Sequence, residues 1–382
     1  MTIRPLHFQD FDFPHCMTPW RAPNGTLTQR WVPYGMPRFR PQVAFVTFYL
    51  YRRNPRSGDV EGPCGTGVCV VVPSAISNAI PHAYGVTSHH VIQAGASIIR
   101  INKRARVMQG KSSILTVTTK FVEFEPHEWQ FLPGGDDIAA VDVTDSIGHE
   151  DDLLSGVYES DFAHLGFIEE SKLTLGEDVF MIGLFTGNPG KQFNHVAVRF
   201  GNISQLAHQS HPVLQGNGAL RASHIVDMHS RPGFSGSPVF VYRTPWNDLT
   251  AIDETGSFFP KLDARHNAFI KLLGIHSGQF IERIDAKRIE TIRPNEPIRD
   301  GDTLAVQSSM AIVVPSWTIL ELLNMQHFRD QRAAREKTQR KQNAPKMRPE
   351  AAIAEPADAN PSHKEDFTAL LGEAVQSQKQ GD

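Results

Sequence analysis

One short segment of the chain carries a serine in a setting suited to nucleophilic chemistry. The segment HSRPGFSGSPVF, residues 229–240, places Ser235 in a Gly-Phe-Ser-Gly run with a proline close on each side. Glycine, serine and proline are also the ordinary residues of turns, so the pattern by itself fits a loop serine equally well. A serine hydroxyl attacks a carbonyl only if a base takes its proton, a second group orients the base, and donors stabilise the oxyanion.

A base and an orienting acid precede this serine in the chain. The run YGVTSHHVI contains His89 and His90 after a strand-like segment, and PGGDDIAAVDV contains Asp136 and Asp137 after a turn. Asp137 lies 47 residues after His90, and Ser235 lies 98 residues after Asp137. Serine hydrolases of unrelated folds place these residue types in different orders, and His, Asp, Ser is the chymotrypsin-like order.

The chain resembles the chymotrypsin-fold (trypsin-like) serine endopeptidases. It is similar to the bacterial members without disulfides, of the HtrA type and the glutamyl-endopeptidase type. Five segments within residues 43–325 carry the resemblance in the family's order: GTGVCVVV, VTSHHVI, DDIAAVDV, LGEDVFMIG and RPGFSGSPVF. The resemblance implies a catalytic triad in which His90 is the base, Asp137 orients it, and Ser235 is the nucleophile.

The resemblance also implies where the donors to the oxyanion lie. The backbone N–H groups of Gly233 and Ser235 would stabilise the negative charge that develops on the substrate carbonyl. A glycine at position 233 fits a tight turn whose backbone angles exclude a Cβ atom. Digestive enzymes of the family have an aspartate before the nucleophile that pairs with a newly cut amino terminus. Phe234 stands there in this chain, so we expect no activation by that route.

The segment LLGIHSGQF resembles the family strand that lines the primary specificity pocket and pairs with extended substrate. In this resemblance Ser277 supports the catalytic aspartate, and Gly278 belongs to the substrate-binding strand. A Gly-Ile-His strand recurs in family members that accept Glu or Gln, which implies a substrate-binding role for His276. An imidazole and the Ser230 hydroxyl could both donate hydrogen bonds to a carboxylate or amide oxygen. We therefore expect a preference for Glu or Gln before the scissile bond.

Strand-like runs of β-branched and aromatic residues must position these side chains. The runs form two successive blocks, separated by a polar link at residues 160–171, and segments with helical periodicity are scarce. The sequence therefore predicts an all-β fold. The resemblance implies two antiparallel β-barrels of the six-stranded chymotrypsin type. The first would span residues 41–165 with the histidine and the aspartate, and the second residues 166–327 with the serine.

The two ends of the chain differ in composition from these blocks. Residues 1–40 are rich in Pro, Phe and Trp without a clear period, which predicts an irregular arm. The run WTILELLNM, residues 317–325, predicts a closing helix capped by Ser316. Residues 328–382 are polar and contain an Ala-, Pro- and Glu-rich stretch, which predicts a disordered tail. Within this tail, DFTALLGEAVQ is a candidate short helix through which a protein partner could dock.

Composition and charge argue against several other classes of protein. The formal net charge of −3 and the pI of about 6.6 predict no general attraction to nucleic acid or to anionic membranes. No segment approaches the roughly 18 apolar residues of a membrane helix, and the amino terminus lacks the pattern of a secretory signal. The three cysteines, Cys16, Cys64 and Cys69, predict no disulfide framework. Together these features predict a cytoplasmic protein.

Two other readings remain open at this stage. A trypsin-like scaffold that retains the motifs without activity would serve as a peptide- or protein-binding module. The 17 histidines also raise the question of a metal site, since His208 and His211 have a plausible spacing. However, the chain has no HExxH segment and no paired CxxC segments. We therefore expect no metal and no cofactor, and a peptide or protein as the substrate.

Overall fold

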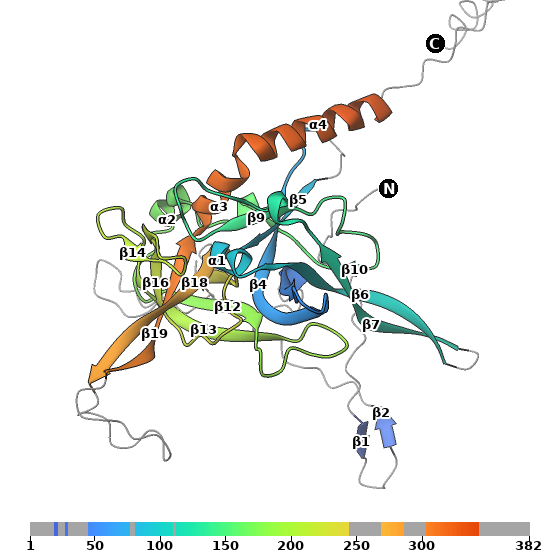
Figure 1. The fold of residues 1–382 in the computed structure, drawn as a ribbon, viewed down its shortest axis with the longest axis horizontal. Helices are drawn as coiled ribbons and strands as arrows, with labels where there is room; N and C mark the ends of the chain where they lie inside the picture. The colour runs from blue at the N-terminus through green and yellow to red at the C-terminus, as the bar shows by residue number, and fades with distance from the viewer. Residues whose placement is uncertain are drawn as a thin grey trace, which may run out of the picture. The chain divides into compact units, whose positions relative to one another are not determined.

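The structure is a computed structural model, and it describes residues 19–21, 27–29, 45–76, 81–109, 112–243, 269–285 and 303–343 (Figure 1). These residues form a mostly β fold with few helices, as the sequence predicts. By backbone contacts, the two β blocks belong to one compact unit, Met1–Lys337.

The second block forms a closed barrel of six antiparallel strands. Around the barrel the strands are β12 (Asp178–Leu184), β13 (Val196–Gln205), β16 (His224–Asp227), β19 (Thr303–Pro315), β18 (Phe269–Asp285) and β17 (Pro238–Arg243). β18 and β19 form the longest hairpin of the barrel, as Figure 1 shows. A second, short hairpin of β14 (Val213–Leu214) and β15 (Leu220–Arg221) lies in the connection between β13 and β16.

The first block forms a nine-stranded sheet. Its main path of paired strands is β10 (Asp152–Leu153), β6 (Ala96–Gln109), β3 (Thr47–Arg53), β4 (Val60–Val72), β5 (His82–Thr87), β9 (Ala139–Asp142) and β8 (Gln130–Phe131). Off this path, β7 (Ser112–Glu123) pairs with β6, and β11 (Val157–Tyr158) pairs with β4 in parallel. The strand pairing among the described residues does not close this sheet, so one closed barrel is shown and not two.

Short elements join and flank these strands. The α-helices are α1 (His89–Gln93), α2 (Leu165–Glu170), α3 (Ser316–Leu323) and α4 (Gln326–Asn343), and the 3-10 helices are η2 (Pro126–Glu128) and η3 (Glu159–Asp161). Residues 1–40, predicted as an irregular arm, contain two short paired strands, β1 (Pro19–Arg21) and β2 (Leu27–Gln29). Strands of three residues are too short to show an alternating pattern, so the sequence did not predict this pairing.

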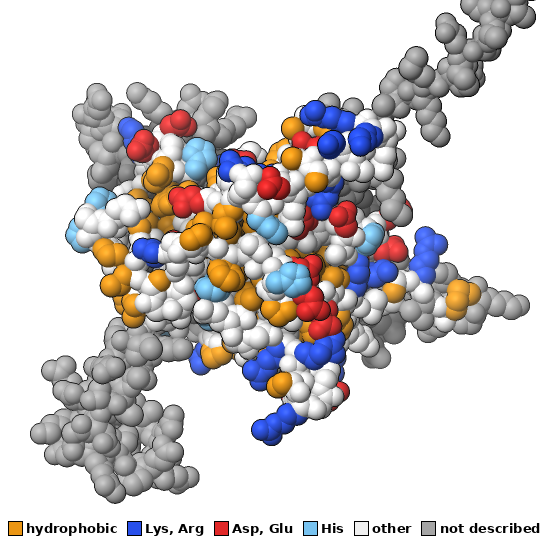
Figure 2. Space-filling view, turned by 45° about the horizontal axis from the view of Figure 1, so that its top comes forward, with side chains coloured by type: hydrophobic (Ala, Val, Ile, Leu, Met, Phe, Trp, Pro, Cys, Tyr) orange, Lys and Arg blue, Asp and Glu red, His pale blue; other side chains and the backbone are white. Residues whose placement is uncertain are grey.

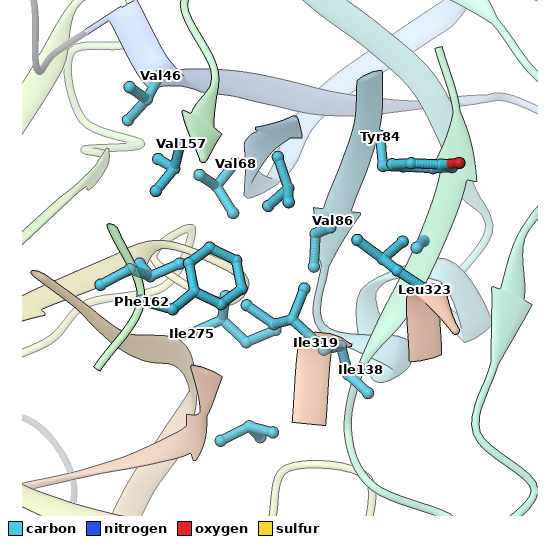
Figure 3. Packing of buried hydrophobic residues seen from close by; sticks show 14 of the residues in the cluster. Val46, Val68, Tyr84, Val86, Ile138, Val157, Phe162, Ile275, Ile319 and Leu323 are labelled. Carbon is cyan, nitrogen blue, oxygen red and sulfur yellow. The ribbon is translucent and has the colours of Figure 1, made fainter. Parts of the chain in front are cut away.

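A continuous hydrophobic core joins the two blocks. Val68, Tyr84 and Val86 of the first sheet pack in one cluster with Phe162, Ile275 of β18, and Ile319 and Leu323 of α3 (Figure 3). The side chains of this cluster are almost completely buried. Each large apolar side chain buried in this way contributes about 2 kcal/mol to folding. The shared core therefore holds the two blocks together at the junction where the predicted site residues meet.

The start of α3 differs from the prediction that Ser316 caps it. The residue at the cap position is Pro315, and Ser316 is the first helical residue. Its hydroxyl donates instead to the carbonyl oxygen of Ala163 at 3.2 Å. A tertiary contact thus takes the hydroxyl that the local pattern assigned to the helix end.

The prediction of a disordered tail from residue 328 is wrong for residues 328–343, which lie in α4. Phe328 is fully buried and meets Tyr84 edge to face with ring centroids 5.1 Å apart. Arg332 donates to the Tyr84 hydroxyl at 3.1 Å, and Arg335 donates to Asp142 at 3.1 Å. These contacts of α4 come from one buried aromatic ring and from arginine side chains. Its sequence can therefore lack the apolar stripe of a packed helix. The candidate helix DFTALLGEAVQ lies outside the described residues.

The surface carries charges of both signs. Lys and Arg side chains and Asp and Glu side chains are both present on the face drawn in Figure 2. In the part of the chain that the structure describes, no helix has the length and apolar character needed to cross a membrane.

Candidate functional site

His90 and Asp137 form the centre of the candidate site. His90 lies in the first turn of α1, directly after β5, and Asp137 lies two residues before β9. His90 Nδ1 is 2.7 Å from Asp137 Oδ2, and the His90 backbone N–H donates to Asp137 Oδ1 at 2.9 Å. An ionised carboxylate only accepts hydrogen bonds, so Nδ1 carries the proton. In the neutral ring, Nε2 is then left as a proton acceptor.

A third hydrogen bond to Asp137 comes from the barrel. The Ser277 hydroxyl, on β18, donates to Asp137 Oδ2 at 2.6 Å. Burial acts to raise the pKa of Asp137, because the carboxylate is fully enclosed. The hydrogen bonds and charge of His90, together with the Ser277 hydroxyl, outweigh this effect and hold the pKa below its ordinary value. The carboxylate therefore stays ionised at neutral pH despite its burial.

The neighbours of these two residues have other contacts. The ring of His89 stacks on Phe131 with centroids 4.4 Å apart. Asp136 Oδ2 lies 3.7 Å from Arg221 Nε. Of the two adjacent histidines and the two adjacent aspartates, it is the second of each, His90 and Asp137, that forms the hydrogen bond.

Ser235 lies on a tight turn that ends where β17 begins. Gly233 and Gly236 have φ angles of +100° and +82°, a region that side chains with a Cβ rarely adopt. Phe234 between them is fully buried, whereas Ser235 is half-buried. The predicted need for glycine at position 233 is confirmed. The buried phenylalanine anchors the turn and leaves the serine at its surface.

The first sheet holds this turn in place. Thr66 of β4 donates from its backbone N–H to the Ser235 carbonyl at 2.9 Å and from its hydroxyl to the Gly233 carbonyl at 2.8 Å. The Gly236 N–H and the Ser88 hydroxyl both donate to the carbonyl of His276, at 2.8 and 2.9 Å. Since Ser88 is two residues before His90, these bonds bring the turn beside the histidine.

The Ser235 hydroxyl itself makes no hydrogen bond to His90 in the described part of the chain. The N–H groups of Gly233 and Ser235 likewise donate no hydrogen bond there. The carbonyls of the same two peptide groups are bonded: Pro232 accepts from the Thr186 hydroxyl at 3.3 Å, and Phe234 accepts from the Ser237 N–H at 2.9 Å. In a trans peptide the N–H points opposite to the C=O, so each N–H points away from the partner of the carbonyl in its own peptide group.

The predicted specificity residues lie beside this turn. His276 is 3% exposed, and in the described chain neither of its ring nitrogens makes a hydrogen bond of ordinary geometry, although a contact with the Phe234 backbone acts to raise the pKa of the ring. Burial, with a smaller effect from His90, lowers the pKa of His276 to about 4, so the ring is neutral at pH 7. Ser230 is also buried, and its hydroxyl donates only a long bond of 3.5 Å to the carbonyl of Arg231. Gly278 pairs with Ile312 across the β18–β19 hairpin.

The sequence assigned no role to three residues that contact the site, although one of them, Thr66, stands in the segment GTGVCVVV. Thr66 orients the turn, and Gln215 and Gly216 of the β14–β15 hairpin contact Asp137 and Ser277. The run QGNGAL that contains the last two is only a turn signal in the sequence. Their partners lie between 61 and 167 positions away along the chain, which no local pattern encodes.

No family model matches the chain, and no curated protein matches it. Among the described residues, no group of three or more His, Cys, Asp and Glu side chains is arranged to hold a metal ion.

Proposed function

We propose that this protein is a serine endopeptidase that cleaves peptide bonds through an acyl-enzyme. The observation that carries the proposal is the buried Asp137 carboxylate, which receives three hydrogen bonds from His90 and Ser277 beside the Ser235 turn. Such a carboxylate fixes the tautomer of the histidine and stabilises the imidazolium that forms when the histidine takes a proton. We also propose the chymotrypsin type of two-barrel fold, with the closed barrel as its second half. The support is the order of His90, Asp137 and Ser235 along the chain, which is the order of that type.

In the proposed reaction, Ser235 Oγ attacks the substrate carbonyl while His90 Nε2 takes the hydroxyl proton. The N–H groups of Gly233 and Ser235 donate to the oxygen that becomes negative, and losing one such donor typically costs about 3 kcal/mol. His90 then returns the proton to the leaving amine as the C–N bond breaks, which leaves an ester on Ser235. Water, deprotonated by His90, hydrolyses this ester and restores the serine.

The absence of a hydrogen bond between Ser235 and His90 is compatible with this role. In free enzymes, bonds between a nucleophile and its base are often long and shorten only when substrate binds. The half-buried position of Ser235 leaves its hydroxyl accessible to a substrate.

The function is tested by covalent labelling. A fluorophosphonate is expected to modify the full-length protein on Ser235, because the adduct forms only with an activated serine. Ser235→Ala should abolish the label. Ser237→Ala should keep it, since that buried hydroxyl has no partner in the described chain. Mass spectrometry of the labelled peptides is the measurement. Equal absence of label from wild type and Ser235→Ala would contradict the peptidase and favour an inactive, peptide-binding scaffold.

We further propose that the peptidase prefers Glu or Gln before the scissile bond. The support is His276, whose buried neutral ring makes no hydrogen bond of ordinary geometry in the described chain and can donate one to a side-chain oxygen of the substrate. A neutral donor suits the Gln amide directly. A Glu carboxylate buried there would favour uptake of a proton by the ring, since an unpaired buried charge is costly.

Cleavage of a peptide library is expected to show Glu or Gln before the cut. Because recognition of Glu couples to protonation of the ring, the ratio of Glu to Gln cleavage should rise as the pH falls. His276→Leu, which retains the bulk and loses the donor, should remove the preference. Sequencing of the cleaved peptides at several pH values measures both effects. A preference for Arg, Lys or aromatic residues would contradict the proposal.

A further inference from the structure

We infer that the β14–β15 hairpin holds the His90–Asp137 pair in its working geometry, with Gln215 and Gly216 as positioning residues. The inference rests on the proposed function, because it names what controls the acid–base pair of that same site. The pair belongs to the first block, whereas the hairpin belongs to the connection between two strands of the barrel. The geometry of the pair then depends on an element from the other half of the molecule.

Gln215 holds the backbone of the aspartate. Its side chain is 3% exposed, and its Oε1 atom accepts the backbone N–H of Asp137 at 2.6 Å. The amide nitrogen of the same side chain donates to the Ser223 hydroxyl at 3.0 Å and, at 3.4 Å, to Asp136. These bonds determine which end of the amide faces Asp137. The Asp137 N–H would be buried without an acceptor if the glutamine were removed, which typically costs about 1 to 3 kcal/mol.

Gly216 sets the direction of the Ser277 hydroxyl. The Gly216 N–H donates to Ser277 Oγ at 2.8 Å, and that oxygen lies 2.6 Å from Asp137 Oδ2. A hydroxyl has one proton, and the carboxylate can only accept. The Gly216 N–H occupies a lone pair of the hydroxyl oxygen, so the arrangement leaves the proton of Ser277 directed at Asp137. The hairpin thereby supports the third hydrogen bond to the carboxylate.

The space at Gly216 leaves no room for a side chain. An added Cβ atom would lie 2.9 Å from His90 Nδ1, 3.0 Å from Asp137 Oδ2 and 2.5 Å from the Ser277 carbonyl oxygen. The glycine thus lies directly against the hydrogen bond that joins His90 to Asp137. Gly218, two residues further along the same turn, has a φ of +86° and no atom within 4 Å of an added Cβ. The two glycines serve different needs, one of space beside the pair and one of backbone conformation.

Hydrogen bonds within the turn and to the first block hold the hairpin in place. Gln215 donates from its N–H to the Ala219 carbonyl at 2.8 Å and accepts the Gly218 N–H at 2.9 Å. Asn217 donates from its side chain to the Gly135 carbonyl at 2.8 Å, close to the aspartate in sequence. A braced turn can hold neighbouring groups to a fraction of an ångström. Misplacement by about 1 Å in an active site can cost about 100-fold in rate.

The test compares Gly216→Ala with Gly176→Ala in the full-length protein. Two measurements are made on each: the rate of fluorophosphonate labelling as a function of pH, and the NMR signal of the His90 Nδ1 proton. A proton held by a carboxylate gives a signal at unusually low field. In Gly216→Ala we expect loss of that signal and labelling slower by about 100-fold. Gly176 has a φ of +85° and open space for an added Cβ, and it lies outside the hairpin. Gly176→Ala therefore strains the backbone without disturbing the hairpin or the pair, and both readouts should stay as in the wild type.

A second variant guards against misfolding. Gln215→Met removes the acceptor of the Asp137 N–H at nearly constant volume, and it should also weaken the low-field signal and slow the labelling. An unchanged His90 signal in folded Gly216→Ala and in Gln215→Met would overturn the inference. Equal losses in Gly216→Ala and Gly176→Ala would overturn it as well, because the loss would then come from general strain and not from the hairpin. Failure of the wild type to label would refute the proposed function, while the NMR comparison would still decide the positioning role.

Discussion

Replacing Asp137 by asparagine is expected to lower the rate of fluorophosphonate labelling and of peptide cleavage by about 10,000-fold, the size typical of this change in serine peptidases. The fold should survive, because asparagine has nearly the same volume. The loss comes from a change in which ring nitrogen of His90 carries the proton. Oδ2 of the carboxylate accepts from His90 Nδ1 and from the Ser277 hydroxyl, and Oδ1 accepts from the His90 backbone N–H. An amide cannot accept at both of its ends.

The consequence is a reversed tautomer. If the asparagine Nδ2 group faces His90, Nδ1 must become the acceptor, and the proton of the neutral ring moves to Nε2. The base that should take the Ser235 proton is then already protonated on the atom that faces the serine. The imidazolium formed during attack would also lose the negative charge that stabilises it.

The measurement is single-turnover labelling beside a matched control, Asp142→Asn. Asp142 lies at the end of β9, five residues after Asp137, and pairs with Arg335 and not with His90. Its replacement should lower the free energy of unfolding and leave the labelling rate close to that of the wild type. A labelling rate within tenfold of the wild type in Asp137→Asn would show that the aspartate does not orient the base.

The protein is expected to lose stability as the pH falls from about 6.5 towards 4, through two buried histidines. Burial lowers the pKa of His224 to about 3, and burial together with His90 lowers the pKa of His276 to about 4. His224 Nδ1 accepts the Ala207 N–H at 3.1 Å, and the ring meets Trp317 edge to face. Nε2 therefore carries the proton of the neutral ring and has no partner within the described chain, and a second proton could bind only at Nδ1, where it would displace the Ala207 N–H.

The sign follows from where the proton binds. Above the ordinary histidine pKa of 6.5, both rings are neutral in the folded and in the unfolded chain. As the pH falls below that value, the unfolded chain takes up protons that the folded chain does not accept until pH 3 to 4. The unfolded state gains accordingly, by about 1.4 kcal/mol per pH unit for each histidine.

Urea unfolding at several pH values between neutral and about 4.5 measures this slope. His224→Asn keeps an acceptor for the Ala207 N–H and removes the titrating ring, so its slope should be smaller by up to about 1.4 kcal/mol per pH unit. The control is His149→Asn. This histidine is exposed, so its replacement leaves both buried rings unchanged and should keep the wild-type slope. A slope in His224→Asn equal to that of the wild type would show that the ring takes up its proton in the folded state.

The sequence determined the elements whose signals are local. Runs such as EDVFMIGLF and SPVFVY became β12 and β17, because β-branched and aromatic residues bounded by turn residues favour strands. Gly233 could be predicted because a left-handed turn excludes a Cβ atom whatever surrounds it. The pairing of His90 with Asp137 followed from the order of motifs and from the resemblance that they carry, and their hydrogen bond lies where that order put it.

Only the tertiary structure decided how the two blocks close and what surrounds the pair. Among the described residues the strands of the second block pair into a closed barrel and those of the first block into an open path, and this depends on pairings between distant strands such as β16 with β19. α4 forms in a polar segment because Phe328 and Arg335 find partners in the first sheet. Gln215 reaches Asp137 across 78 positions, and Thr66 reaches Gly233 across 167. Contacts of this kind have no periodicity in the chain, so they exist only once the packed core has brought the two blocks together.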